Sequence, residues 1–323
     1  MPFLDKYRSI IRNAINKHKL TNPPHQLYDP INYILSIGGK QLRPIFLLMS
    51  CDLFKGNIER AVKPALGIEY FHNFSLMHDD IMDKATLRRG KETVHVKYDE
   101  NVAILSGDAL MVKSFQMLED LEPQLFKKCF HLFSQTALEV CEGQQYDMNF
   151  EKQSDVSYEE YINMITGKTA VLCACAFQMG ALLAEADEED SKNMYEFGKS
   201  LGIAFQLMDD YLDVFGNQES VGKKHAGDIV ENKKTILYIL ARQKANEELR
   251  QKLNGWYTIK GENINKVNEV LAIFNDLNVG DSCLELIKTY SDQSKNYLDK
   301  VKADATKKQS FYKLIDYLLV RES

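Results

Sequence analysis

The sequence predicts an all-α fold, and three observations support that prediction. All seven prolines of the 323-residue chain lie at or before Pro123, so residues 124–323 contain none of the residue type that most strongly interrupts helices. Apolar residues make up 45% of the chain, which is enough for a substantial core. In the first segment they recur at helical spacing, so residues 3–15 are expected to form an amphipathic helix.

The rest of the chain reads as helices joined by polar connections. A linker with two adjacent prolines is expected at residues 21–29, and charged or polar loops are expected at 84–98 and 219–228. Further helices are expected over residues 30–37, 44–53, a central segment that includes 69–83, 102–118, 124–148, 158–184, 191–215, 229–253, 263–277, 280–303 and 310–320. The length alone would suit two domains, but single helical domains also reach this size, and we expect one domain over residues 1–323.

Composition narrows the class of protein. The net charge is −6 and no long basic run occurs, so nucleic acid is not an expected partner. The N-terminal segment lacks the continuous apolar core of a signal peptide, and no run of eighteen apolar residues predicts a transmembrane helix. The six cysteines are scattered without a CxxC pair, so they are interpreted as buried reduced thiols of a cytoplasmic protein.

An acidic cluster ends the central stretch, residues 69–89, which reads EYFHNFSLMHDDIMDKATLRR. On a helix, Asp79 and Asp83 lie one turn apart on the same face, and Asp80 flanks them. Three carboxylates this close repel one another, and Mg²⁺ relieves that cost by taking one or two carboxylates together with water and phosphate oxygens. The preceding run is apolar almost all round, so the helix is expected to be buried. The alternative is a solvated acidic turn with a basic cap.

A second cluster repeats the spacing of the first. Asp209, Asp210 and Asp213 lie within another apolar helical run, residues 197–215. Two acidic clusters of equal spacing, each embedded in a hydrophobic helix, are difficult to explain as solvated faces. The pair therefore predicts metal sites for an anionic, apolar-tailed ligand.

The two DDxxD motifs are accompanied by two further motifs. Gly38-Gly39-Lys40-Gln41-Leu42-Arg43-Pro44 precedes the first, and Gly167-Lys168-Thr169 lies between them. Together they resemble the trans-isoprenyl diphosphate synthases, the polyprenyl synthetase family, over about residues 35–240. The resemblance implies a helical bundle around a deep central cavity, usually as a homodimer. It also implies a prenyltransferase that condenses isopentenyl diphosphate with an allylic diphosphate to a linear all-trans product.

The resemblance also implies roles for individual residues. Asp79, Asp83 and Asp209 would bind Mg²⁺, usually three ions in this family, with more indirect roles for Asp80, Asp210 and Asp213. The cations that clamp the allylic diphosphate would be Arg88, Lys168, Lys223 and Lys233. The residues that hold isopentenyl diphosphate would be Lys40, Arg43, His72 and Arg89. Near the reacting carbons, the oxygens of Thr169 and Gln206 would stabilise positive charge. Without the family match, His72 reads as a hydrogen-bonded core histidine.

Two departures from the family pattern concern the loop after the second cluster. Asn232 stands where the family commonly has glycine, but asparagine also tolerates left-handed backbone. Lys233 is chosen over its neighbour Lys234 because it lies ten residues after Lys223, the family's spacing. Near the C-terminus, Arg321 is a candidate to close over isopentenyl diphosphate.

The length of the product is expected to depend on the floor of the cavity. Phe74 lies five residues before Asp79, about 7.5 Å along the axis at 1.5 Å per residue, and Ser75 beside it is small. By resemblance, an aromatic residue at the fifth position alone stops growth at twenty carbons, which predicts geranylgeranyl diphosphate. Farnesyl diphosphate is the alternative product, and the alternative role for Phe74 is ordinary core packing.

Two other classes of protein share the helical fold. A class I terpene cyclase or head-to-head condensing enzyme typically lacks the Gly-Gly-Lys segment and the second full DDxxD motif, and both are present here. A non-catalytic helical subunit usually loses an aspartate cluster, whereas this chain keeps all six aspartates. The sequence therefore favours the active prenyltransferase.

Overall fold

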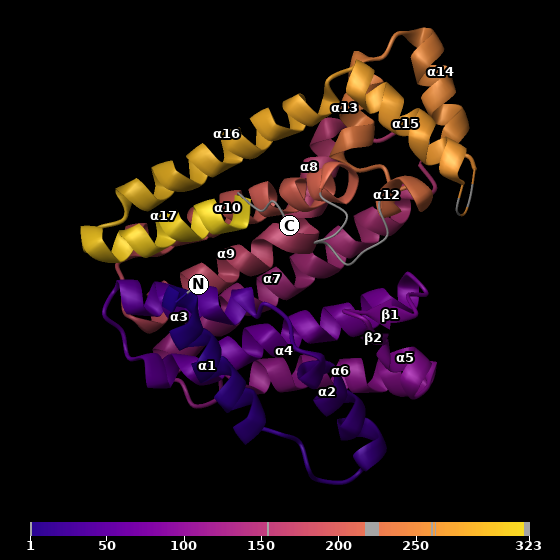
Figure 1. The fold of residues 1–323 in the computed structure, drawn as a ribbon. Helices are drawn as coiled ribbons and strands as arrows, with labels where there is room; N and C mark the ends of the chain where they lie inside the picture. The colour runs from indigo at the N-terminus through magenta and orange to yellow at the C-terminus, as the bar shows by residue number, and fades with distance from the viewer. Residues whose placement is uncertain (1, 154, 217–225, 260, 262, 320–323) are drawn as a thin grey trace. The chain divides into compact units, whose positions relative to one another are not determined.

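Helices account for nearly all of the computed structural model, which describes residues 2–153, 155–216, 226–259, 261 and 263–319 (Figure 1). Among these residues the only strands are β1 (Leu87–Arg88) and β2 (Lys91–Glu92), which pair antiparallel. The predicted all-α class is confirmed. The chain forms two compact units: residues 1–137 with 175–194 (the first unit), and residues 138–174 with 195–323 (the second unit). The single domain remains a prediction.

The first unit is built around α4 (Ile58–Met82), the predicted central helix. Asn57 caps its start, because the Asn57 side chain accepts the backbone N–H groups of Glu59 and Arg60. Its neighbours are α1 (Pro2–Lys17), α2 (His25–Ile37), α3 (Leu42–Leu53), α5 (Val94–Lys97) and α6 (Glu100–Gln116). Most of the apolar side chains of α4 are buried, so this helix forms the core of the unit, as its sequence predicts.

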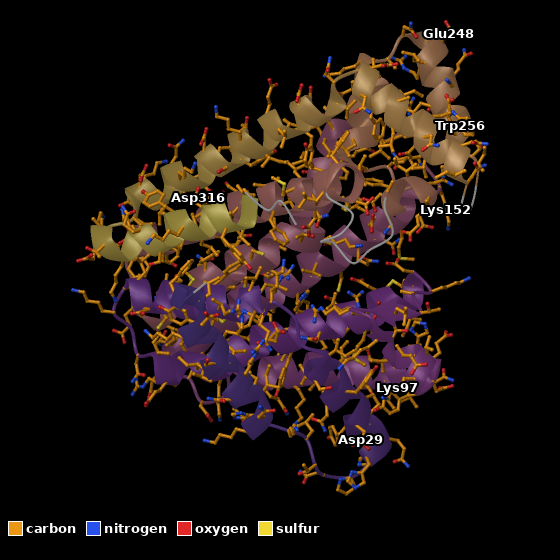
Figure 2. All side chains as sticks on the ribbon, viewed as in Figure 1. Asp29, Lys97, Lys152, Glu248, Trp256 and Asp316 are labelled. Atoms are coloured by element: carbon orange, nitrogen blue, oxygen red, sulfur yellow. The ribbon has the colours of Figure 1, made fainter. Side chains whose placement is uncertain are left out.

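The predicted linker at residues 21–29 is wrong in its second half, because α2 begins at His25. The helix continues through Pro30, and a proline near a helix start removes only one intrahelical hydrogen bond. Ser106 of α6 holds the first turn, since its hydroxyl donates to the Leu27 carbonyl at 2.9 Å. Asp29 and Lys97 lie at this edge of the unit, where α2 meets α5 (Figure 2).

The second unit buries one large apolar cluster among its helices. It contains the second half of α7 (Pro123–Phe150), α8 (Tyr158–Ile165), the π-helical turn η1 (Thr166–Ala170), the start of α9 (Val171–Leu183), most of α10 (Glu188–Phe215), α12 (Gly227–Val230), α13 (Ile236–Lys244), α14 (Glu247–Trp256), α15 (Ile264–Asp276), α16 (Val279–Lys300) and α17 (Ala305–Leu319). Within this unit α16 and α17 run side by side, while α13, α14 and α15 gather at one end (Figure 1).

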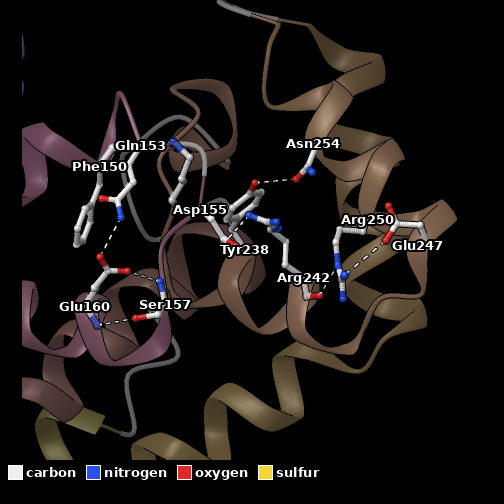
Figure 3. A network of polar contacts seen from close by, with 11 residues as sticks. Phe150, Gln153, Asp155, Ser157, Glu160, Tyr238, Arg242, Glu247, Arg250 and Asn254 are labelled. Atoms are coloured by element: carbon white, nitrogen blue, oxygen red, sulfur yellow. Dashed lines mark hydrogen bonds and ion pairs between the residues drawn. The ribbon is translucent and has the colours of Figure 1, made fainter.

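The single helix predicted over residues 229–253 is wrong, because the chain breaks twice there. Ala245 is extended, and the Asn246 side chain starts α14 by accepting the Leu249 N–H at 2.9 Å. Arg250 then reaches back to the end of α13, where it donates to the Arg242 carbonyl at 3.3 Å (Figure 3). It also donates to the Ala245 carbonyl at 3.3 Å. The apolar spacing continues across this break, so the pattern alone could not locate it.

Two further expectations are settled by burial. Among the described residues, one helical run, 158–183, is long and apolar enough to cross a membrane, but 72% of its apolar window is buried inside the structure, as in a core helix. The cysteines are the second of these expectations. None of the six is in a disulfide, as predicted. Five of them are buried, but Cys141 is exposed, so the prediction of burial is wrong for that residue.

Candidate active site

The first acidic cluster lies at the C-terminal end of α4. Asp79 and Asp80 belong to the helix and Asp83 caps it, with its N–H donating to the Asp79 carbonyl at 2.8 Å. The helical turn therefore extends through the cluster, and the predicted spacing of Asp79 and Asp83 is confirmed. Asp80 turns inward and is only 2% exposed. There it accepts hydrogen bonds from Arg88 Nε at 2.8 and 2.9 Å and from Arg88 Nη2 at 2.7 Å.

The β1–β2 hairpin positions Arg88 and its neighbour Arg89 beside this helix. Arg89 adopts φ 55° at the hairpin tip, and its guanidinium packs against Gly39. A Cβ atom on Gly39 would lie 2.4–2.7 Å from that guanidinium, and Gly39 itself has φ 143°. Backbone conformation therefore favours glycine at both positions, since Gly38 also has a positive φ of 76°, and a side chain on Gly39 would displace the Arg89 guanidinium. The Gly-Gly sequence brings Lys40 and Arg89 to the same region, as expected.

Arg43 and His72 are joined directly. Arg43 lies in the first turn of α3 and its Nη1 donates to His72 Nε2 at 3.1 Å. Burial, together with the charges of Arg43, Arg89 and Arg88, lowers the pKa of His72 well below its ordinary value. The imidazole is therefore neutral, with Nε2 as acceptor and Nδ1 carrying the proton. His72 is hydrogen-bonded, as expected of a core histidine. Its partner, Arg43, is however one of the residues predicted to hold isopentenyl diphosphate.

Glu69 is a residue of this region that sequence reasoning missed. Its carboxylate is buried one turn before His72 and Asn73, where Oε1 accepts from Asn73 Nδ2 at 3.1 Å and Oε2 has no hydrogen-bond partner. Burial raises the pKa of Glu69 to about 7, although Asn73 and the charges of Arg43 and Arg89 oppose the shift. The sequence feature that could have identified Glu69 is its position inside an otherwise apolar helical run.

Replacing Glu69 by glutamine will remove a pH dependence of stability. The folded pKa of about 7 lies above the ordinary 4.5, so the stabilising contribution of the protonated acid is complete below pH 4.5 and lost as pH rises through 7. The shift corresponds to about 3 kcal/mol in the free energy of unfolding. Urea unfolding of Glu69→Gln and of the control Glu248→Gln, measured from pH 4.5 to 8, tests this. Equal pH slopes in the two variants would contradict it.

The predicted chain-length residues occupy the middle of α4. Phe74 is 7% exposed, and its ring centroid lies 4.8 Å from that of His78 and 5.4 Å from that of Phe71. The cluster continues to Phe133, whose centroid is 5.5 Å from that of Phe71. Ser75 is half-buried, and its hydroxyl donates to the His72 carbonyl at 2.9 Å. A buried ring packed against two aromatic groups, Phe71 and His78, does not move aside easily.

The second acidic cluster lies in the last turns of α10 and repeats the arrangement of the first. The middle aspartate, Asp210, is again buried, at 4% exposure. It accepts from Gln206 Nε2 at 3.0 Å and from the Tyr161 hydroxyl, while burial and the charge of Asp228 raise its pKa. Asp213 accepts the Asp228 backbone N–H at 3.0 Å. Each cluster thus buries its middle carboxylate and keeps two, one turn apart, on the more accessible face, where Asp213 already accepts one backbone hydrogen bond.

Lys168 and Thr169 belong to the π-helical turn η1. Lys168 Nζ pairs with Asp147 at 2.5 Å, and Thr169 Oγ1 donates to Gln206 Oε1 at 3.0 Å. Thr169, Gln206, Asp210 and Tyr161 therefore form one continuous hydrogen-bonded chain. Short π-helical segments are frequent at functional sites because they re-aim side chains. The structure thus brings together the predicted residues of this segment, pairs Lys168 with Asp147, whose segment also resembles a family motif, and adds Tyr161.

The loop after α10 is described only in part. Lys223 lies outside the described residues, as does Arg321 near the C-terminus. Lys233 is exposed and pairs with Glu231 at 3.0 Å, whereas Lys234 donates to the Phe150 carbonyl at 2.7 Å. Of the two adjacent lysines, the one chosen by spacing is therefore the more accessible. Asn232 adopts φ 62°, a left-handed conformation that asparagine tolerates.

The donor chemistry of both clusters fits Mg²⁺. Carboxylate oxygens are the ligands that this hard ion prefers, and it needs only one or two of them when water and phosphate fill the other positions. Over the described part of the chain, no three acidic, histidine or cysteine side chains converge to form a complete metal cage. A pair of accessible carboxylates one turn apart is consistent with an ion that is bound jointly with a phosphate ligand.

Comparison with known proteins finds relatives that cover most of the chain. The chain is 41% identical to a geranylgeranyl diphosphate synthase of Saccharolobus solfataricus, covering 80% of this chain and 79% of that protein. It is 35% identical to a geranylfarnesyl diphosphate synthase of Aeropyrum pernix, covering 92% and 95%. The crystal structure of a geranylgeranyl pyrophosphate synthase, 40% identical, superposes with a TM-score of 0.94 over 99% of both chains. Residues 24–274 match the family described as polyprenyl synthetase. The family resemblance read from the two acidic motifs is thereby confirmed, and the chain belongs to the polyprenyl synthetase family.

Proposed function

We propose that this chain is a prenyltransferase that condenses isopentenyl diphosphate with an allylic diphosphate, giving linear, all-trans geranylgeranyl diphosphate. The observation that carries the proposal is the repeated carboxylate arrangement. In both clusters the middle aspartate is buried and anchored, and two carboxylates one turn apart remain on the more accessible face. Membership of the polyprenyl synthetase family and relatives named as geranylgeranyl diphosphate synthases support the same reaction.

The aspartates would hold Mg²⁺, which we propose to number three ions. Asp79, Asp83 and Asp209 would be direct ligands, and Asp213 would act through water. Asp80 and Asp210 would hold the cluster in shape, because their oxygens are already engaged by Arg88, Gln206 and Tyr161. When bound, Mg²⁺ supplies positive charge that neutralises the diphosphate as it leaves the allylic carbon.

The cationic residues would divide between the two substrates. Arg88, Lys168, Lys223 and Lys233 would bind the allylic diphosphate. Lys40, Arg43, His72 and Arg89 would bind isopentenyl diphosphate, with the neutral His72 donating through Nδ1 while Arg43 holds its other nitrogen. This division follows the family resemblance and the grouping of the second set around α3 and α4.

Thr169 and Gln206 would act on the carbon skeleton. The Thr169 hydroxyl donates to Gln206 Oε1, so both oxygens are held in one orientation by the chain that ends at Tyr161. Fixed oxygen dipoles stabilise the positive charge that develops when the allylic carbon–oxygen bond breaks. The double bond of isopentenyl diphosphate then forms the new carbon–carbon bond, and loss of a proton to the released diphosphate restores a double bond.

The proposed activity is tested with dimethylallyl diphosphate, isopentenyl diphosphate and Mg²⁺. We expect release of diphosphate and a prenyl diphosphate product only when both substrates are present, and no turnover in a chelator. Hydrocarbon formed from the allylic substrate alone would indicate a cyclase instead. Binding of both substrates without turnover would indicate a non-catalytic subunit.

Phe74→Ala will lengthen the product beyond twenty carbons. The buried ring is held by Phe71 and His78, so it forms a fixed stop along α4, and its removal opens space for further isoprene units. Ser75→Phe is the matched opposite change and should shift the product toward farnesyl diphosphate. Chromatography of dephosphorylated products measures both. An unchanged distribution in Phe74→Ala would leave Phe74 an ordinary core residue.

We also propose a homodimer and a cytoplasmic location. Leu105 and Val112 are 61% and 55% exposed on one face of α6, and Phe130 of α7 is 41% exposed. Large exposed apolar side chains on one helix face are typical of a surface that a second copy covers. The cytoplasmic location is supported by the six cysteines, none of which is in a disulfide, as is typical of proteins in a reducing compartment. Sedimentation equilibrium of the purified chain decides between one copy and two.

A further inference from the structure

A polar pocket of about 440 Å³ lies between α1 and the Gly-Gly-Lys loop of the first unit. Its walls are Asp5, Arg8, Ser9, Arg12, Gly39 and Lys40. Only Gly39 and Lys40 of these belong to the motifs that carry the proposed function. We propose that this pocket binds the diphosphate group of isopentenyl diphosphate, with Arg8 and Arg12 of α1 as additional ligands beside Lys40. This inference rests on the proposed function and extends its substrate site to the N-terminal helix.

The charge balance of the pocket favours an anion. Three cationic side chains face one carboxylate, and that carboxylate is already engaged, because Arg8 Nη1 donates to Asp5 Oδ1 at 2.5 Å. Arg12 lies one turn after Arg8, is exposed, and makes no ion pair within the described part of the chain. Like charges at this helical spacing destabilise a helix by a few tenths of a kcal/mol, and a bound anion reverses that cost. An arginine fork also matches phosphate oxygens bidentately.

The position of the arginines is fixed by the packing of α1. Leu4, Tyr7 and Ile11 are buried on the opposite face of this helix. The Tyr7 hydroxyl donates to Asp52 Oδ2 of α3 at 2.6 Å, and Lys6 pairs with the same oxygen at 3.2 Å. α1 is therefore anchored to α3, the helix whose first turn contains Arg43. This anchoring fixes the position of Arg8 and Arg12 relative to the Gly-Gly-Lys loop.

Gly39 connects the pocket to the proposed substrate site. It lines the pocket and is also in close contact with the Arg89 guanidinium, with no room for a Cβ atom between them. An anion held by Lys40 would therefore lie beside the α1 arginines, with the Arg89 guanidinium next to the adjoining Gly39. The lining of the pocket is polar and contains no large apolar side chain, so it suits a diphosphate head group and not an isoprenoid tail.

Arg12→Gln tests the proposal by two independent measurements. Calorimetry without Mg²⁺ should show binding of isopentenyl diphosphate weakened about tenfold, the loss expected for one charge-assisted hydrogen bond. In turnover, KM for isopentenyl diphosphate should rise by a similar factor while KM for the allylic substrate stays constant. Arg60→Gln, an exposed arginine at the start of α4, is the control and should change neither quantity.

A diphosphate group in the pocket could belong to isopentenyl diphosphate or to free inorganic diphosphate, so binding of both compounds is measured. Weaker binding of both isopentenyl diphosphate and inorganic diphosphate by Arg12→Gln supports the proposal. Weaker binding of inorganic diphosphate alone would overturn it, because the pocket would then hold the free anion and not the substrate. Unchanged binding of both would also overturn it. If the wild-type chain forms no prenyl product, the proposed function fails separately, since calorimetry reports on the pocket without turnover.

Discussion

Asp79→Ala and Asp209→Ala will each lower turnover by about a thousandfold or more, while helical content remains that of the wild type. Each substitution removes an accessible carboxylate from a site whose charge balance matters most as the diphosphate leaves. The folded structure should survive, because the buried members of the clusters, Asp80 and Asp210, keep their partners. Steady-state kinetics over a range of Mg²⁺ concentrations, with circular dichroism, measures both expectations.

The control for these variants is Asp316→Ala, an exposed aspartate on α17 (Figure 2). It removes the same charge from the chain without touching either cluster, so its turnover should equal that of the wild type. Excess Mg²⁺ should partly restore a variant that has lost only one ligand. Wild-type turnover in either cluster variant, or in the wild-type chain with a chelator, would contradict the metal-dependent mechanism.

The sequence predicted the helical class and the central helices well, because these depend on local signals. Proline placement and apolar spacing identify long buried helices, and the apolar run through residue 71 marks α4. The break at Ala245 was missed because Arg250 and Asn246 create it through capping contacts that interrupt no apolar pattern. The early start of α2 was missed because a proline was treated as a boundary when it sits inside the helix.

The candidate site was predicted by residue type but not by its supporting contacts. The motifs identified the six aspartates, yet they did not indicate that the middle aspartate of each cluster is buried. That property depends on Arg88, eight residues from Asp80, and on Tyr161, forty-nine residues from Asp210. Such contacts follow from tertiary packing, and helical periodicity gives no information about which distant residues meet. Glu69 was overlooked for the same reason, because only the fold shows that arginines surround it.

The second large effect is expected from a single methyl group, in Gly143→Ala. A Cβ atom on Gly143 of α7 would lie 2.2 Å from the Lys168 backbone nitrogen and 2.6 Å from the Gly167 carbonyl carbon. Real Cβ atoms do not approach this closely, and the obstacle is backbone, which cannot rotate aside. The helix and the π-helical turn must therefore separate, which we expect to lower the free energy of unfolding by about 3 kcal/mol.

Gly143→Ala will also impair catalysis, because the turn that it displaces contains Lys168 and Thr169. Separation of α7 from η1 would disturb the 2.5 Å pair of Lys168 with Asp147 and the 3.0 Å bond of Thr169 to Gln206. Gly255→Ala in α14 is the matched control, since nothing lies within 4 Å of its new methyl group. That exposed helical position should gain about 0.5–1 kcal/mol. Denaturant unfolding of the two variants measures the contrast, and equal stabilities would show that α7 and η1 are not in the close contact on which the placement of Lys168 depends.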